Sequence, residues 1–145
     1  MAITAAMIGC DSKEYFSAYQ RLDKDGWASN KQVAFAIDSK DTQIEHNLFV
    51  MVRNTKRYKY QNLYLFLDVM APSGKLERDT IECLLADAGG KWYGDHSGDI
   101  VESKVWFKTD YKFTELGQYQ FLFEQAMRED KLEEVLDLGF RVEYK

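Results

Sequence analysis

Two short apolar runs on either side of a polar, basic segment most constrain what this chain can fold into. The runs occupy residues 48–52 and 63–69, and both are rich in Val, Leu and Phe. Runs of this length and composition favour strands over helices. The segment between them, residues 53–62, contains no Pro or Gly, so it predicts a broad connection rather than a two-residue hairpin turn.

Alternation of apolar and polar residues predicts further strands along the chain. It is clearest near the C-terminus, where every second residue from 136 to 144 is apolar. Similar patterns predict strands at residues 33–37, 79–85, 105–107, 111–113 and 118–127. Residues 15–23 are expected to be extended or to form one helical turn, and residues 127–132 a charged turn or a short helical piece. Pro72, Ser73 and Gly74 form the clearest turn.

These patterns predict an all-β fold. Roughly seven to nine short strands at about ten-residue spacing, with no βαβ alternation, are typical of an antiparallel β-sandwich or jelly-roll. A chain of 145 residues with 46% hydrophobic residues has enough apolar surface for a single packed domain. It contains no apolar run of about 18 residues, so no membrane-spanning helix is predicted. The net charge of −5 argues against non-specific binding to nucleic acid.

Motifs for catalysis or metal binding are missing from the sequence. His46 and His96 stand in no HExxH or His-x-His pattern, and the two cysteines lack CxxC spacing. No GxSxG, P-loop or GxGxxG motif occurs. We therefore predict a protein that is not an enzyme and that needs neither a metal ion nor a cofactor. Cys83 is expected to be a small buried side chain, although two cysteines also permit one disulfide.

The basic segment between the two central strands is a candidate partner surface. Arg and Tyr are enriched in interface hot spots, so this segment could face an acidic protein partner or a phosphate-rich glycolipid. The alternative is a solvated loop whose tyrosines cover the sheet edge. The candidate residues are Arg53, Lys56, Arg57, Tyr58, Lys59 and Tyr60.

A glycine-rich loop at residues 89–99 is a candidate ligand loop. Its aromatic rings could stack on a sugar, and its carboxylates could offer oxygen ligands to Ca²⁺. On this hypothesis the domain is a carbohydrate-binding module that uses the Trp92/Tyr93 loop. The alternative is a long connection whose Trp92 plugs one end of the sandwich. The candidate residues are Trp92, Tyr93, Asp95, His96 and Asp99.

The first nine residues are apolar or small, and Cys10 follows them directly. Such a segment resembles the lipobox of bacterial lipoproteins, in which the cysteine carries acyl chains that hold the protein to a membrane. We therefore expect residues 1–14 to be a signal remnant and tether, and residues 15–145 to be the folded domain. The alternative is an incidental cysteine near the start of the chain.

Several short motifs follow Cys10 and Trp27 in a defined order. They are RNTKRYKYQNLYL at 53–65, PSG at 72–74, DTIE at 79–82, GKWYG at 90–94, GDI at 98–100, GQY at 117–119, QAMR at 125–128 and LGFRVE at 138–143. Taken together with Cys10, these motifs resemble the gliding-motility lipoprotein GldH family of Bacteroidetes. The resemblance extends over nearly the whole chain after Cys10.

This resemblance implies a non-enzymatic lipoprotein of the cell envelope, with Cys10 as the lipid-attachment site. It implies a place on the periplasmic side of a membrane or at the cell surface. The implied partners are envelope or secretion proteins, because the family is associated with gliding motility and with secretion of adhesins and chitinase. The resemblance transfers no catalytic residue.

Overall fold

The computed structural model describes residues 12–145, and every regular element in this part of the chain is a β-strand. The described part therefore contains no helix that could cross a lipid bilayer. The all-β prediction is confirmed. In chain order the strands are β1 (Glu14–Arg21), β2 (Trp27–Ala28), β3 (Val33–Ser39), β4 (His46–Thr55), β5 (Asn62–Met70), β6 (Leu76–Leu84), β7 (Asp95–Ser97), β8 (Ile100–Tyr111), β9 (Gly117–Gln125), β10 (Lys131–Leu132) and β11 (Val135–Tyr144).

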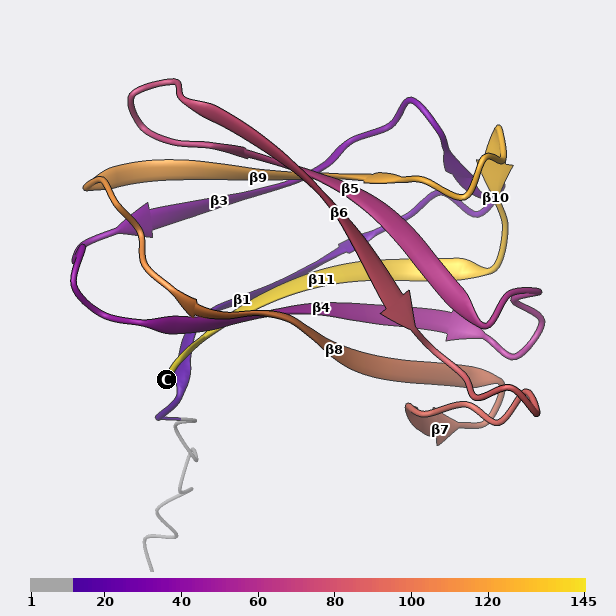
Figure 1. Cartoon of the computed structure of the whole chain (residues 1–145). Helices are drawn as coiled ribbons and strands as arrows, with labels where there is room; N and C mark the ends of the chain where they lie inside the picture. Colours follow the sequence, from indigo (N-terminus) through magenta and orange to yellow (C-terminus); the bar gives the residue numbers. More distant parts are fainter. Residues whose placement is uncertain (1–11) are drawn as a thin grey trace, which may run out of the picture.

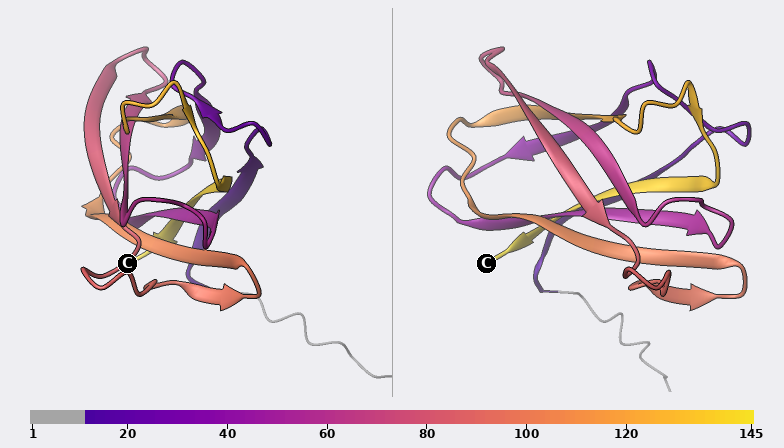
Figure 2. Two further views of the ribbon diagram at one scale, coloured as in Figure 1. Left: turned by 90° about the vertical axis from the view of Figure 1, so that its right-hand side faces the viewer. Right: turned by 45° about the vertical axis from the view of Figure 1, so that its right-hand side comes forward.

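The strands form two antiparallel sheets that face each other (Figures 1 and 2). One sheet has the order β1-β11-β4-β8-β7 and the other the order β3-β9-β5-β6, while β10 and β2 form a small separate pair. The chain passes directly from one sheet to the other between β3 and β4, β4 and β5, β6 and β7, and β8 and β9, and it also crosses by way of β2 and of β10. The predicted antiparallel β-sandwich is confirmed, and its connections gather at the two ends.

Aromatic side chains fill the space between the sheets. Phe140 of β11 lies against Phe121 and Phe123 of β9, with ring centroids 4.7 and 5.5 Å apart. All three side chains are fully buried. Alternation along each strand turns these residues inward, so the pattern that predicted the strands also builds the core. Burial of such large rings holds the two sheets together.

A β-bulge near the start of β11 changes the predicted alternation. The register of β11 on β4 shifts between Val135 and Asp137. Because a shift of one residue turns side chains to the opposite face, Val135 is buried, whereas Leu136 is only half-buried. Leu138, Phe140 and Val142 follow the predicted inward alternation.

Two predictions about individual segments were wrong. Residues 105–107 and 111–113 are not two short strands: the first lie within β8, which ends at Tyr111. Strand β8 continues through its polar residues because its backbone pairs with that of β4. The broad connection at 53–62 is shorter than predicted, because β4 continues through residue 55 and leaves 56–61 as the loop. Two other segments take the non-helical alternative predicted for them. Residues 15–23 are extended, mainly within β1, and residues 127–132 form a charged bend that leads into β10.

The two ends of the sandwich carry different segments (Figure 1). We call the end at which β1 begins and β11 ends the N-terminal end. The connections 40–45, 71–75 and 112–116 lie close by. The opposite end, called the loop end below, carries the connections 22–26, 56–61 and 85–94, together with β7 and the turn 98–99. Both candidate sites from the sequence are on the loop end.

Candidate functional site

The loop end brings together the two segments that the sequence singled out. Arg57, in the connection after β4, forms an ion pair with Asp99, which precedes β8: Nη1 lies 2.5 Å from Oδ2. The backbone N–H of Lys56 also donates to the carbonyl oxygen of Asp99, at 2.9 Å. The candidate partner surface and the candidate ligand loop are therefore neighbours on one surface.

Glu134 joins this cluster from the connection between β10 and β11. Its Oε2 lies 3.5 Å from Arg57 Nη2 and accepts a hydrogen bond of 2.5 Å from the hydroxyl of Thr55. The hydrogen bond from Arg57 to Asp99, together with the charge of both carboxylates, raises the pKa of Arg57. The Arg57 side chain is nevertheless 64% exposed, so water competes for both ion pairs. Such pairs add little to stability and exchange partners readily.

A second cluster lies beside the first. Glu129 accepts a hydrogen bond of 2.8 Å from the hydroxyl of Tyr60 and forms an ion pair of 2.6 Å with Lys59. These two donors, Lys59 first, lower the pKa of the Glu129 carboxyl. Lys59 is largely exposed, whereas Glu129 is mostly covered. The cation therefore faces solvent, with its carboxylate partner beneath it.

Tyr58 and Arg53 have other surroundings. Tyr58 is only 4% exposed, and its hydroxyl donates to the carbonyl oxygen of Asn62 at 2.8 Å. It belongs to the core, so it does not contribute to a partner surface. Arg53 lies in β4 and places Nη1 3.2 Å from Oδ2 of Asp137 in β11.

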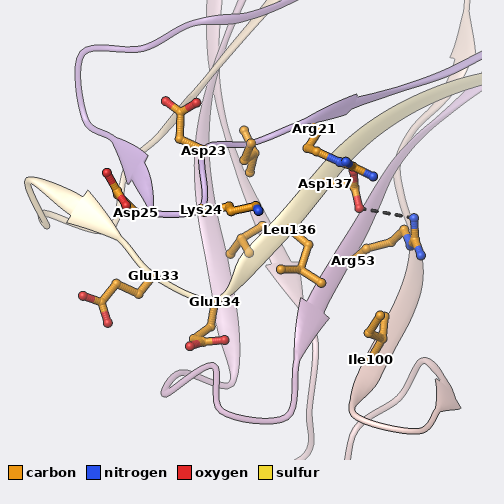
Figure 3. Close-up of a pocket in the computed structure, with 12 residues that line it drawn as sticks. Arg21, Asp23, Lys24, Asp25, Arg53, Ile100, Glu133, Glu134, Leu136 and Asp137 are labelled. Atoms are coloured by element: carbon orange, nitrogen blue, oxygen red, sulfur yellow. Dashed lines mark hydrogen bonds and ion pairs between the residues drawn. The ribbon is translucent and has the colours of Figure 1, made fainter.

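A pocket of about 560 Å³ opens beside Arg53 (Figure 3). Its walls come from the end of β1, the connection 22–25, and the chain around the start of β11. Carboxylates outnumber cations in this lining, so the loop end is a surface of mixed charge and not a simple basic patch. The acidic residues are Asp23, Asp25, Glu133, Glu134 and Asp137, and the basic ones are Arg21, Lys24 and Arg53.

The candidate ligand loop does not form one binding platform. Trp92 is half-buried and packs against the core, whereas Tyr93 is 64% exposed. Asp95 and His96 lie in β7 and point into solvent, separately from the Asp99–Arg57 pair. Within residues 12–145 no group of three or more His, Cys, Asp or Glu side chains is placed to hold a metal ion. Neither sugar stacking nor Ca²⁺ binding gains support from this arrangement.

The structure describes only one of the two cysteines, Cys83. Cys10, the predicted lipid-attachment site, lies outside the described residues. Cys83 is fully buried and makes no disulfide, which confirms its predicted place in the core. Burial raises the pKa of the Cys83 thiol to about 12, so it is protonated and unreactive at neutral pH.

Sequence reasoning missed the acidic partners of the basic segment. Glu129, Glu134 and Asp137 pair with residues that lie 69 to 84 positions earlier in the chain. The available signal was the acidic run in residues 129–137, which the sequence places between two predicted strands. Because β11 pairs with β4, which leads into the basic segment, this acidic run lies beside that segment in the fold.

Comparisons with known proteins extend over this whole structure. The model of the family described as GldH lipoprotein matches residues 14–142. The chain is 36% identical over 141 residues to a gliding motility lipoprotein GldH homolog of Christiangramia forsetii, covering 92% of this chain and 86% of that protein. It is 34% identical over 146 residues to the gliding motility lipoprotein GldH of Flavobacterium johnsoniae, covering 96% and 90% of the two chains.

Proposed function

This chain belongs to the GldH lipoprotein family, and we propose on that premise that it is a lipid-anchored envelope protein that serves gliding motility by docking onto other proteins. Acyl chains on Cys10 hold it to a membrane in this proposal. The proposed partners are other components of the motility or secretion machinery. The observation that carries the proposal is the similarity to two gliding motility lipoproteins over more than nine-tenths of this chain.

The loop end is the proposed docking surface. Lys56, Arg57 and Lys59 are exposed there, and Arg57 and Lys59 pair with carboxylates in contacts that water also reaches. A partner with both acidic and basic side chains can exchange these pairs: its carboxylates bind Arg57 and Lys59, and its cations bind Asp99 and Glu129. Complementary charges of this kind govern specificity and the rate of association more than affinity.

The proposed role is non-enzymatic. The pKa shifts at the loop end strengthen the ordinary charge states: the pKa of Arg57 is raised and that of Glu129 is lowered, each chiefly by its ion-pair partner. A general acid or base needs a pKa shifted toward the working pH, which is the opposite direction. This arrangement supports binding and offers no poised proton-transfer group at these positions.

Affinity capture from native membranes tests the docking. A tagged full-length protein is captured, and the proteins recovered with it are identified by mass spectrometry. We expect Arg57→Glu with Lys59→Glu to lose envelope partners that the wild type retains. The matched control is Lys75→Glu with Lys108→Glu, which makes the same change of charge at exposed positions away from the loop end: Lys75 lies in the connection 71–75, and Lys108 pairs with Leu48 near the start of β4.

The possible outcomes test separately whether the loop end is the docking surface and whether the protein docks at all. Equal recovery with the loop-end variant and the wild type would exclude the loop end as the docking surface. Recovery of no envelope protein with the wild type would contradict docking itself.

A further inference from the structure

We propose that the N-terminal end of the sandwich rests on the lipid bilayer, with Ile44 and Leu116 in contact with it. The loop end then faces away from the membrane. This inference depends on the lipid anchor at Cys10 proposed above, and it goes further by fixing how the domain is oriented and which residues meet lipid.

The chain between Cys10 and the folded domain is too short to hold the domain far from an anchor. The carbonyl oxygen of Lys13 already accepts a hydrogen bond of 2.8 Å from the N–H of Tyr144, and β1 begins at the next residue. Cys10 lies three residues before Lys13. Because an extended chain spans at most roughly 3.6 Å per residue, about 11 Å is the longest distance between their Cα atoms. An acylated Cys10 therefore brings the N-terminal end to the membrane surface.

Two loops at this end present apolar side chains to solvent. Ile44 is 40% exposed in the connection before β4, and Leu116 is 64% exposed in the connection before β9. Hydrogen bonds fix both loops. Asp41 Oδ1 accepts from the N–H of Ile44 at 3.1 Å, and the N–H of Glu115 donates to the hydroxyl of Tyr119 at 3.0 Å. Apolar side chains held beside a lipid anchor fit the boundary between headgroups and acyl chains.

The charges at this end are compatible with a phospholipid surface. Glu45 and Asp110 both pair with Lys145, whose single positive charge offsets part of their negative charge. Lys40 and Lys112 are exposed, and neither forms an ion pair with another residue of the range 12–145. Exposed lysines near apolar loop tips are attracted to anionic headgroups. Tyr144, which is 39% exposed at the same end, is of a residue type enriched at membrane interfaces.

This orientation leaves the loop end accessible. Strand β4 runs from His46 at the N-terminal end to Thr55 at the loop end (Figure 1). Nine steps of roughly 3.3 Å along a strand amount to about 30 Å. Arg57 and Lys59 consequently stand about one sandwich length away from the lipid surface. The anchor and the proposed docking surface do not compete for space.

Site-directed labelling of the full-length protein tests the orientation. Ile44→Cys and Leu116→Cys place a thiol at the N-terminal end, and Lys59→Cys and Tyr93→Cys are matched exposed positions at the loop end. Each variant is purified from cell membranes, labelled with a thiol-reactive fluorophore, and reconstituted into vesicles of zwitterionic and anionic phospholipid. The buried Cys83 thiol stays unlabelled, and the parent protein without an added cysteine gives the background. Lipids with nitroxide-bearing headgroups then serve as the quencher.

We expect loss of fluorescence from labels at 44 and 116, and none from labels at 59 and 93. Flotation of the vesicles distinguishes the possible failures. Protein that floats but shows no quenching at 44 and 116, or equal quenching at all four positions, overturns the orientation and leaves the anchor standing. Protein that does not float overturns the anchor and the orientation with it. Cys10→Ser should abolish flotation.

Discussion

The connections at the two ends of the sandwich are joined in different ways, although the loop end also buries aromatic rings and the N-terminal end also carries exposed ion pairs. At the N-terminal end, aromatic rings pack on one another: His46 lies 4.9 Å from Tyr15 and 5.3 Å from Phe113, measured between ring centroids. At the loop end, exposed ion pairs such as that of Arg57 with Asp99 join the connections. Packed rings are removed from water, whereas exposed charges remain hydrated. The N-terminal end is therefore expected to be the more stable one.

The difference matches the two proposed roles. A domain held close to a membrane by a short tether needs a rigid contact surface, and the aromatic cluster fixes the N-terminal end. A docking surface needs groups that can exchange one partner for another, which exposed ion pairs permit.

The largest effect is expected from Phe113→Ala. Phe113 is fully buried, and its ring lies 5.1 Å from that of Tyr111 and 5.0 Å from that of Tyr119. Removing such a ring leaves a cavity and lowers the free energy of unfolding by about 3–5 kcal/mol. Denaturant unfolding measures it. Phe113→Leu keeps most of the buried area and should lose less. A loss below about 1 kcal/mol for the alanine variant would mean that the aromatic cluster is not what holds this end.

An intermediate effect is expected from the titration of His46. Its side chain is 2% exposed, and burial lowers its pKa from the usual 6.5, so it stays neutral in the native state where the unfolded chain takes up a proton. The unfolded state then binds more protons, and stability is lost as the pH falls below 6.5 toward the native pKa.

The variant His46→Phe isolates this contribution. It keeps a ring in the cluster and removes the titrating group, so its stability should fall less than that of the wild type as the pH falls below 6.5. Unfolding by denaturant at several pH values gives both curves. Parallel curves for the two proteins would show that His46 takes up its proton equally in the native and unfolded states.

The sequence predicted the long strands better than the short strands and loops at the ends of the sandwich. Strands β4, β5, β9 and β11 carry apolar alternation or apolar runs, which is information held within each segment. Strands of two or three residues, such as β7, have no such pattern. They exist because a neighbouring strand offers backbone groups to pair with, and sequence alone does not show which neighbour will be present.

The same limit applies to the candidate site. The basic residues were visible in the sequence, but Glu134 and Asp137, two of the carboxylates that pair with them, arrive only when β11 pairs with β4. Tyr58 and Tyr60 stand two positions apart in one loop, yet Tyr58 is buried and Tyr60 reaches Glu129. A loop lacks the regular period that assigns faces in a strand, so contacts made by distant segments decide each direction.

The smallest effect on stability is expected from Arg57→Gln at the loop end. The change removes the charge that pairs with Asp99 and Glu134, but that side chain is 64% exposed and its contacts are hydrated. The unfolding midpoint should stay within experimental error of the wild type, while the recovery of envelope partners in affinity capture decreases. Raising the salt concentration should weaken capture in the same way, because salt screens exposed charges.

Arg57→Gln separates binding from stability in a single variant. If Arg57→Gln destabilised the protein as much as Phe113→Ala, the ion pairs would be structural and the two ends would not differ in kind. If stability and capture were both unchanged, the loop end would remain adaptable but would not be where the partner binds. Loss of capture at unchanged stability is the result that assigns adaptability and docking to the same surface.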